Sequence, residues 1–290
     1  MSEKLIAQIT DIHYPVYKTF KFKDLFSKRI TGFANLLFSS RRRFRPHLLP
    51  LSLQNLERLG VKHIVITGDL VNLAYPAEYV SLKEVLEESS FTPSQFTIIP
   101  GNHDAYTKTA YANNNLHKNL GLFAGVDSFA SYPLVRDIGD FTIIGLSTAI
   151  PTEFGMAYGR IDDLQLQKLK VLLENSDKPQ VIALHHPPQK GLDGWSDGLV
   201  NGSELRKLLS RSKVECILHG HEHLNSGHWL QGIDSTRIPV YGTSCAILDP
   251  KQSSKNATVR LLRFLDGHLD KTWLVKYNKK TGHWNSVDTI

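Results

Sequence analysis

Short runs of apolar residues, many of them β-branched, alternate with longer segments of helical pattern along the larger, N-terminal part of the chain. Each run ends abruptly at a polar or glycine position. Near-continuous apolar runs of this length are typical of strands that are buried on both faces of a sheet. The pattern predicts strands over residues 4–10, 63–67, 96–100, 141–146, 180–184 and 214–218.

Segments of helical pattern separate several of these strands. A leucine-rich segment ends before Gly60, a second segment begins at Pro76, and a third opens with acidic residues, where the helix dipole favours them. In the fourth, Ser203 is a suitable N-cap. The alternation of strands and helices indicates an α/β fold. The predicted helices cover residues 48–59, 76–89, 162–175 and 202–212.

From about residue 225 the pattern changes to strands with few helical segments. Asp266–Gly267 forms a predicted turn between two of these strands. We expect this β-rich C-terminal part to complete a second sheet. The predicted architecture is therefore two packed mixed β-sheets flanked by helices, an α/β/β/α sandwich.

The composition is that of an ordinary globular protein, since 41% of the 290 residues are hydrophobic and 21% are charged. No linker, low-complexity tract or internal repeat divides the chain, so we predict one domain over residues 1–290. Cys216 and Cys245 stand among apolar neighbours and are expected to be buried thiols. The N-terminus lacks the apolar core of a signal peptide, and no apolar run approaches the ~18 residues of a membrane-spanning helix. We therefore expect a cytoplasmic protein.

Five of the predicted strands end in side chains that can bind metal ions. In open α/β sheets, ligands bind beyond the carboxyl ends of the strands. A single aspartate there is usually a turn or cap residue, and a single histidine is more often hydrogen-bonded than a ligand, but five such ends are hard to dismiss. Gly68, Gly101 and Gly220 accompany three of them, and glycine permits close backbone approach. The polar residues at these ends are Asp11, His13, Asp69, Asn102, His103, His185, His186, His221 and His223.

The chemistry of these side chains narrows the kind of site. Carboxylate, amide and imidazole groups from separate loops suit borderline divalent metals such as Mn, Fe, Zn or Co. Sites without thiolate ligands usually leave coordination positions open for water. A pair of such ions stabilises both the attacking and the leaving oxygen of an in-line displacement.

The ordered blocks "DIH", "GD", "GNHD", "HHPP" and "GHEH", which span residues 11 to 223, resemble the calcineurin-like metallophosphoesterases. The resemblance implies a hydrolase of phosphoric ester or pyrophosphate bonds that uses two divalent or mixed-valence metal ions. A hydroxide that bridges the ions would be the nucleophile, since metal-bound water reaches a pKa near ~7. The implied ligands are Asp11, His13 and His223 for the first metal, Asn102, His185 and His221 for the second, and Asp69 as the bridge between them.

The block "GNHD" also carries the implied catalytic residues. Asn102 and His103 would contact the substrate, and His103 would protonate the leaving oxygen as a general acid. Asp104 would orient His103 and favour its charged form, or it would only cap the following helix. His186 either lines the site or packs in the rigid turn of "PPQ", and His219 is expected to be structural.

A basic insertion at about residues 14–46 separates the first two blocks. Between residues 18 and 45, nine basic residues and one acidic residue give a local charge of +8, which leaves −2 for the remainder of a chain whose net charge is +6. Three interpretations stay open: a cap helix on the core, an interfacial helix on an anionic membrane, and a clamp for a phosphate-rich substrate. An apolar stripe predicts the helix and consists of Phe22, Leu25, Phe26, Ile30, Phe33 and Leu37.

The substrate is left open between a phosphodiester, a phosphomonoester and a pyrophosphate. Cyclic nucleotide phosphodiesterases carry the same blocks, and so do the lipid A pathway pyrophosphatases that cleave UDP-diacylglucosamine. The basic insertion favours a nucleotide-linked or lipid-linked substrate and a peripheral location at the inner face of a membrane. Nucleic acid is disfavoured as a partner, because no DNA-capping domain is evident. A non-catalytic scaffold of the same fold would have lost ligands, and none is missing here.

Overall fold

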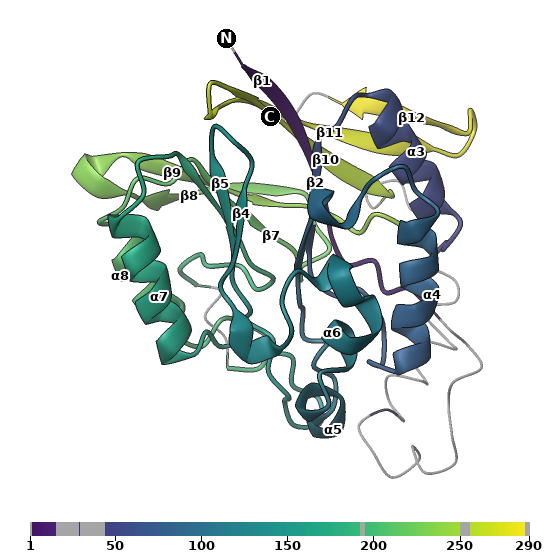
Figure 1. The fold of residues 1–290 in the computed structure, drawn as a ribbon, viewed down its shortest axis with the longest axis horizontal. Helices are drawn as coiled ribbons and strands as arrows, with labels where there is room; N and C mark the ends of the chain where they lie inside the picture. Colours follow the sequence, from purple (N-terminus) through teal and green to yellow (C-terminus); the bar gives the residue numbers. More distant parts are fainter. Residues whose placement is uncertain (1, 16–28, 30–43, 192–194, 250–255, 288–290) are drawn as a thin grey trace.

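Two six-stranded sheets pack against each other in the computed structural model, with helices on both outer faces (Figure 1). The structure describes residues 2–15, 29, 44–191, 195–249 and 256–287. In Figure 1, α3, α4 and α6 lie on one side of the sheets, and α7 and α8 lie on the other. The predicted fold class, two packed mixed sheets flanked by helices, is confirmed.

The first sheet joins the N-terminal strands to the C-terminal end of the chain. Its strand order is β12-β11-β10-β1-β2-β3. The pairs β1–β2 and β2–β3 are parallel, and the other three pairs are antiparallel. The strands are β1 (Glu3–Ile9), β2 (His63–Thr67), β3 (Phe96–Ile99), β10 (Thr258–Leu265), β11 (His268–Asn278) and β12 (His283–Val287).

The second sheet has the order β4-β5-β6-β7-β9-β8. Its central pairs β5–β6, β6–β7 and β7–β9 are parallel, and the two outer pairs are antiparallel. The strands are β4 (Leu134–Asp137), β5 (Thr142–Gly145), β6 (Gln180–Ala183), β7 (Cys216–His219), β8 (Ser226–Gln231) and β9 (Arg237–Gly242).

Three layers of apolar side chains hold the sandwich together. One lies between the first sheet and the helices on its outer face, one between the second sheet and α7 and α8, and one between the two sheets. Burial on both faces explains why the central strands are nearly continuous apolar runs. The helices are α3 (Leu48–Arg58), α4 (Pro76–Glu87), α5 (Lys108–Ala112), α6 (Asn115–Leu120), α7 (Asp163–Glu174) and α8 (Gly202–Leu209), with short 3-10 turns η3 (Pro93–Gln95), η4 (Gly121–Ala124), η5 (Phe129–Ser131) and η6 (Ile233–Ser235).

Two local predictions from the sequence are wrong. The C-terminal part does not belong to one sheet: β8 and β9 complete the second sheet, whereas β10, β11 and β12 extend the first. The cap position of α8 is Asn201, not Ser203, because the helix already begins at Gly202. The predicted turn at Asp266–Gly267 is confirmed, since both residues adopt positive φ angles between β10 and β11.

The basic insertion lies mostly outside the described residues. The predicted amphipathic helix over residues 22–37 is described only at Arg29, whose Nε donates to the Leu73 carbonyl at 3.0 Å. The proposed membrane contact through residues 18–45 therefore stays a prediction. Within the described ranges, no helix has the length and apolar character that crossing a bilayer requires.

His117 on α6 supplies a stability prediction. The side chain is 4% exposed, packs edge-on against Phe129 at 4.7 Å between ring centroids, and has no hydrogen-bond partner among the described residues at either ring nitrogen. The variant His117→Leu is expected to raise the free energy of unfolding by roughly 1 kcal/mol at pH 8, because it removes buried polar atoms without partners.

The advantage of this variant should grow in acid. Burial lowers the pKa of His117 from 6.5 to about 4, so the stability that depends on the neutral ring is present above pH 6.5 and is lost as pH falls towards 4. At pH 5 the wild type should have lost about 2 kcal/mol that the leucine variant keeps. Urea unfolding at pH 8 and pH 5 measures both values. The exposed His283→Leu serves as the control, and an equal shift there would contradict the assignment.

Candidate metal centre

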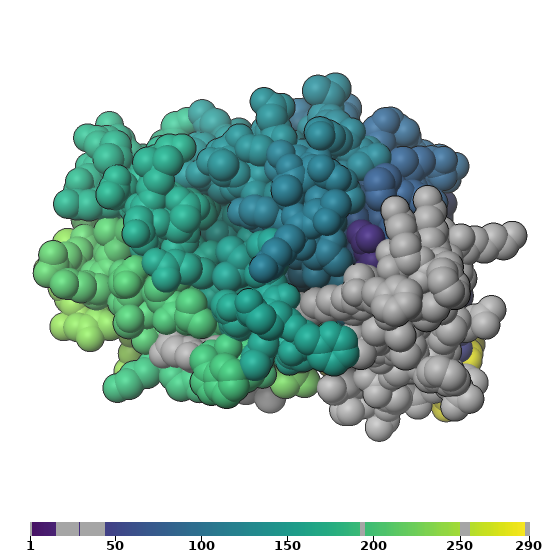
Figure 2. Space-filling model, turned by 90° about the horizontal axis from the view of Figure 1, so that it is seen from below, coloured from purple at the N-terminus to yellow at the C-terminus, as the bar shows by residue number. Residues whose placement is uncertain are grey.

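The predicted site residues gather at one edge of the sandwich, where strands of both sheets end. Asp11 and His13 follow β1, Asp69 follows β2, and Asn102 and His103 follow β3. From the second sheet, His185 follows β6, and His221 and His223 follow β7. Figure 2 looks onto the lower face of the molecule in the view of Figure 1, towards which β1 runs, and a small purple part of the N-terminal segment reaches the surface there.

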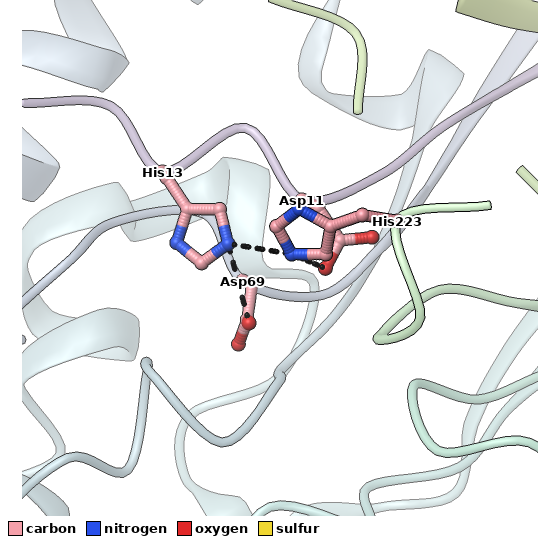
Figure 3. Close-up of side chains that lie close together, drawn as sticks. All are labelled: Asp11, His13, Asp69 and His223. Carbon is pink, nitrogen blue, oxygen red and sulfur yellow. Dashed lines mark hydrogen bonds and ion pairs between the residues drawn. The ribbon is translucent and has the colours of Figure 1, made fainter. Parts of the chain in front are cut away.

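Four of these residues form a first cluster, which Figure 3 shows with its side chains converging. One ligand atom from each of Asp11, His13, Asp69 and His223 lies within 4.8 Å of all the others. His13 Nε2 lies 3.2 Å from His223 Nε2 and 3.5 Å from Asp69 Oδ2. His223 Nε2 lies 3.3 Å from Asp11 Oδ1. Two carboxylates and two imidazoles therefore point at one small volume.

Three further residues form a second cluster around the other oxygen of Asp69. His185 Nε2 lies 3.4 Å from Asp69 Oδ1 and 3.1 Å from Asn102 Oδ1. His221 Nδ1 also lies 3.1 Å from Asn102 Oδ1. Asp69 thus turns one oxygen to each cluster. This thiol-free set of carboxylate, amide and imidazole groups fits a pair of divalent metal ions.

The backbone at this edge adopts conformations that ordinary residues avoid. Asp11, His13, Asp69, His221 and His223 all have positive φ angles, between 45° and 71°. Non-glycine residues in this region are strained, and such strain is found mainly at functional sites. The left-handed turns direct these side chains towards the clusters directly after each strand.

Glycines allow the loops to approach one another as the sequence predicted. A Cβ atom at Gly68 would collide with the His185 ring, and one at Gly101 would collide with the Asp69 carboxylate. At Gly220, a Cβ would collide with the hydroxyl of Thr10. Any side chain at these three positions would push the clusters apart.

Outer contacts fix which ring nitrogen faces each cluster. His185 Nδ1 donates to the Thr67 carbonyl at 2.8 Å, which leaves Nε2 towards Asp69 and Asn102. His221 Nε2 donates to the Asp197 carbonyl at 2.7 Å, which leaves Nδ1 towards Asn102. Hydrogen bonds of this kind hold metal-binding histidines in one tautomer and orientation.

The electrostatics of the site keep both carboxylates ionised. Burial, the largest single effect, raises the pKa of Asp11, but the neighbouring His223 and His185 together outweigh it, and the pKa falls to about 2. Burial likewise opposes ionisation of Asp69, yet His185 and His103 hold the pKa well below its ordinary value. Two buried negative charges side by side favour positive charge between them. Burial lowers the pKa of His13 to about 3, so this ring is uncharged and has a nitrogen lone pair that could bind a metal ion.

His103 lies beside both clusters without joining either one. Its backbone N–H donates to Asp69 Oδ1 at 2.8 Å, and its Nδ1 donates to the Asn72 carbonyl at 2.7 Å. The ring stands edge-on to His13 at 4.7 Å and stacks on Tyr106 at 5.3 Å. These contacts leave Nε2 as the ring nitrogen that is able to exchange a proton with a substrate.

The contact predicted between Asp104 and His103 is not formed, because other groups take both oxygens of Asp104. Its Oδ2 accepts from the N–H groups of Gly101 at 2.8 Å and Leu70 at 3.2 Å, and its Oδ1 accepts from the Tyr79 hydroxyl at 3.3 Å. Burial, followed by the charge of Asp69, raises the pKa of Asp104 to about 8. Asp104 ties together the two loops that carry Asp69 and His103, and the Asn72 carbonyl orients His103.

The two remaining histidines use their ring nitrogens for structural bonds. His186 Nδ1 lies 2.7 Å from the Thr148 hydroxyl, and its Nε2 donates to the Ala157 carbonyl at 2.8 Å. The ring packs on that of His221 at 4.4 Å. His219 Nδ1 donates to the Gly220 carbonyl at 3.0 Å. Neither histidine joins a cluster.

A further aromatic side chain that the sequence did not single out covers the first cluster. Phe44 is buried, and its ring lies 5.1 Å from that of His13 and 6.4 Å from that of His223. The backbone of Phe44 forms an isolated antiparallel β-bridge with Leu248, and the neighbouring Arg45 forms an ion pair with Asp249. The C-terminal end of the basic insertion thus packs on the metal centre.

The fold and this paired cluster define a metal-dependent phosphoesterase, and comparison with known proteins gives the same class. A family model described as calcineurin-like phosphoesterase matches residues 4–225. The chain belongs to the calcineurin-like phosphoesterase family and is a hydrolase with a dinuclear type of metal centre.

Two relatives are named as enzymes of cyclic nucleotides. A 3′,5′-cyclic-nucleotide phosphodiesterase of Nostoc sp. is 29% identical in an alignment 302 residues long, which covers 96% of this chain and 94% of that protein. A probable cyclic nucleotide phosphodiesterase of Psychrobacter sp. is 27% identical over 184 residues, which cover 62% of this chain but only 52% of that protein. The chain therefore spans about half the length of the second relative.

Solved structures with the same fold are more distant in sequence. A dimetal phosphatase from Danio rerio superposes with a TM-score of 0.63 at 15% identity, covering 93% of this chain and 95% of the other. The purple acid phosphatase PPD1 of yellow lupin gives a TM-score of 0.60 at 13% identity, covering 98% of this chain and 53% of the other. These two likenesses show the shared fold.

Proposed function

We propose that this protein hydrolyses cyclic nucleotides, a class of phosphodiester, at a pair of divalent metal ions. The observation that carries the metal assignment is the position of Asp69, whose two carboxylate oxygens face two separate clusters. Asp11, His13 and His223 would hold one ion, and Asn102, His185 and His221 would hold the other. When bound, such a pair supplies Lewis acidity and an activated water at neutral pH.

The chain's own residues have distinct tasks in this proposal. Asn102 offers a neutral amide oxygen, so the second ion keeps more positive charge for the substrate than a carboxylate would leave it. His103, fixed through Nδ1 by the Asn72 carbonyl, presents Nε2 to the leaving oxygen as a general acid. Asp104 holds the loops that carry Asp69 and His103 together through the N–H groups of Leu70 and Gly101.

The choice of substrate rests on the relatives. Both relatives reported above are named as cyclic nucleotide phosphodiesterases, and one of them matches nearly the whole chain. A lipid-linked or nucleotide-linked pyrophosphate is the second candidate, favoured by the cluster of basic residues between positions 18 and 45. The two candidates require different bonds to be cleaved, so activity separates them.

An activity panel with added Mn²⁺ tests the proposal. We expect hydrolysis of bis-p-nitrophenyl phosphate and cyclic AMP, weaker hydrolysis of p-nitrophenyl phosphate, and little cleavage of a UDP-linked pyrophosphate. Dialysis against EDTA should abolish activity, and Mn²⁺ should restore it, because neutral and anionic N/O ligands release such ions to a chelator. Preference for the pyrophosphate would replace the cyclic nucleotide assignment. Less than about one metal equivalent after reconstitution, where two are expected, would favour a non-catalytic scaffold.

A further inference from the structure

A buried arginine stands in the row of apolar side chains that fills the space between the two sheets. On β10, Leu262 and Phe264 belong to the core between the sheets. Arg260 occupies the next position on the same face, because side chains alternate along a strand. It is 2% exposed and lies opposite Leu274 of β11. A charged side chain therefore takes a place where the strand pattern calls for an apolar one.

Every hydrogen-bond partner of Arg260 is neutral. Nε donates to Thr243 Oγ1 at 3.2 Å, Nη1 to Thr272 Oγ1 at 3.3 Å, and Nη2 to the carbonyls of Gly242 at 3.0 Å and Ser226 at 3.4 Å. No carboxylate of the described chain lies within ion-pair distance of the guanidinium. Of its five N–H groups, four are used in these bonds. A buried charge without a counter-charge is costly, so the site would gain from a bound anion.

A hollow opens directly at this arginine. Its volume is about 640 Å³, within the range of small-molecule sites. Lys276 adds a second positive charge, and Trp229 and Tyr241 add aromatic surface. Trp229 is 58% exposed on the edge strand β8, and the Arg260 guanidinium lies 4.8 Å from the Tyr241 ring centroid. None of the described residues that line the hollow is acidic.

A neighbouring hollow extends the same positive surface. It has a volume of about 440 Å³, shares Lys276 and Val287 with the first, and adds Lys279 and Lys280. None of its described lining residues is acidic either. Cationic groups and flat aromatic surface thus occur together, and none of the proposed metal ligands lines either hollow.

The arginine is held rigidly by a buried chain of hydrogen bonds. The Thr243 hydroxyl, which accepts from Arg260, donates to Gln8 Oε1 at 2.7 Å. Gln8 Nε2 donates to Thr67 Oγ1 at 3.0 Å, and the Thr67 carbonyl in turn accepts from His185. A guanidinium fixed in this way needs little reorganisation to bind an anion, which favours affinity. This series of hydrogen bonds also connects the hollow to the metal centre.

We propose that this hollow binds a small organic phosphate with a planar ring, of the nucleotide class, at a site separate from the metal centre. The phosphate would pair with Arg260 and Lys276, since guanidinium and ammonium groups form charge-assisted hydrogen bonds with phosphate oxygens. The ring would stack on Trp229 or Tyr241, because stacking on aromatic side chains accepts any nucleobase.

Calorimetric titration of EDTA-treated protein tests the proposal, because the metal centre then contributes no metal-dependent binding. The probes are AMP, inorganic phosphate and adenosine. Lys276→Glu should weaken AMP binding by at least about tenfold, through loss of an attraction and gain of a repulsion. Trp229→Ala should weaken AMP and adenosine binding and leave phosphate binding unchanged. The matched control is Lys271→Glu, an exposed lysine of β11 that lines neither hollow.

The outcomes separate this site from the catalytic proposal. Both test residues lie at the surface of the hollow, so the variants should keep the wild-type melting temperature and the wild-type rate on bis-p-nitrophenyl phosphate. Absence of heat with all three probes would overturn the proposal. So would AMP affinity in Lys276→Glu equal to that of the control. Neither result depends on whether the metal centre hydrolyses cyclic nucleotides.

Discussion

The variant Asp69→Ala is expected to lose metal-dependent phosphoester hydrolysis by at least about 10³-fold, which corresponds to about 4 kcal/mol of transition-state stabilisation. Asp69 turns one oxygen to each cluster, with Oδ2 3.5 Å from His13 Nε2 and Oδ1 3.4 Å from His185 Nε2. Its Oδ1 also accepts the backbone N–H of His103 at 2.8 Å. Its loss should therefore weaken both ion sites and release the residue proposed as the acid.

Two measurements make this prediction specific. Metal analysis after reconstitution with Mn²⁺ should show fewer ions per chain, and Asp69→Asn, which keeps the shape and one oxygen, should retain part of the metal. Asp137→Ala removes an exposed carboxylate that pairs with Lys178 at 2.7 Å and should leave activity unchanged. Wild-type turnover by a folded Asp69→Ala protein with added Mn²⁺ would rule out the shared role of this carboxylate.

The convergence of the proposed metal ligands could be predicted because each one lies within four residues of the end of a strand that is a short apolar run. A buried parallel strand has a strong pattern in sequence, and its carboxyl end fixes where the next side chain lies. His185 illustrates this: the strand β6 is wholly buried, and the ring enters the centre two residues after it. The ordered blocks then add the family resemblance, which implies the ion, or the pair of ions, that each residue would hold.

The contacts behind the ligands were not predictable for a physical reason. The groups that orient His103, His185 and His221 are the carbonyls of Asn72, Thr67 and Asp197. Every residue has a carbonyl, so such contacts leave no trace in residue type or spacing. The predicted contact between Asp104 and His103 is absent for the related reason that adjacency in "GNHD" does not make two side chains face each other. The turn at Gly101 directs its carboxylate back to two backbone N–H groups.

Strand pairing between distant segments was the other limit. The sequence predicts that the β-structure after residue 225 completes a second sheet. In the structure β10 instead pairs with β1 of the first sheet, with Glu3 opposite Leu265. The strands of both sheets contain buried apolar positions, so the sequence pattern of β10 is the same whether it pairs in the first sheet or in the second. Arg260 shows the consequence. Its position between the sheets, on the same face as Leu262 and Phe264, follows from the strand pairing and could not be read from "ATVRLL".

The variant His103→Ala is expected to lower turnover of cyclic AMP by roughly 10²-fold or more while the metal content stays at the wild-type level. The His103 ring stands edge-on to His13 at 4.7 Å, and its Nδ1 is bonded to the Asn72 carbonyl. The bond to Asp69 Oδ1 comes from the backbone N–H of His103 and does not need the side chain. Removing the ring therefore removes Nε2 as a proton donor and leaves all seven proposed ligands in place.

The leaving group decides whether the lost function is that of a general acid. Cyclic AMP releases an alkoxide that needs a proton, whereas bis-p-nitrophenyl phosphate releases a stable phenolate. His103→Ala should therefore lose much more activity on cyclic AMP than on the aryl diester. The exposed His283→Ala is the control for histidine loss. Equal losses on both substrates would assign His103 to phosphate binding, because the benefit of proton donation depends on how much charge the departing oxygen develops. Loss of metal would assign His103 to the centre itself.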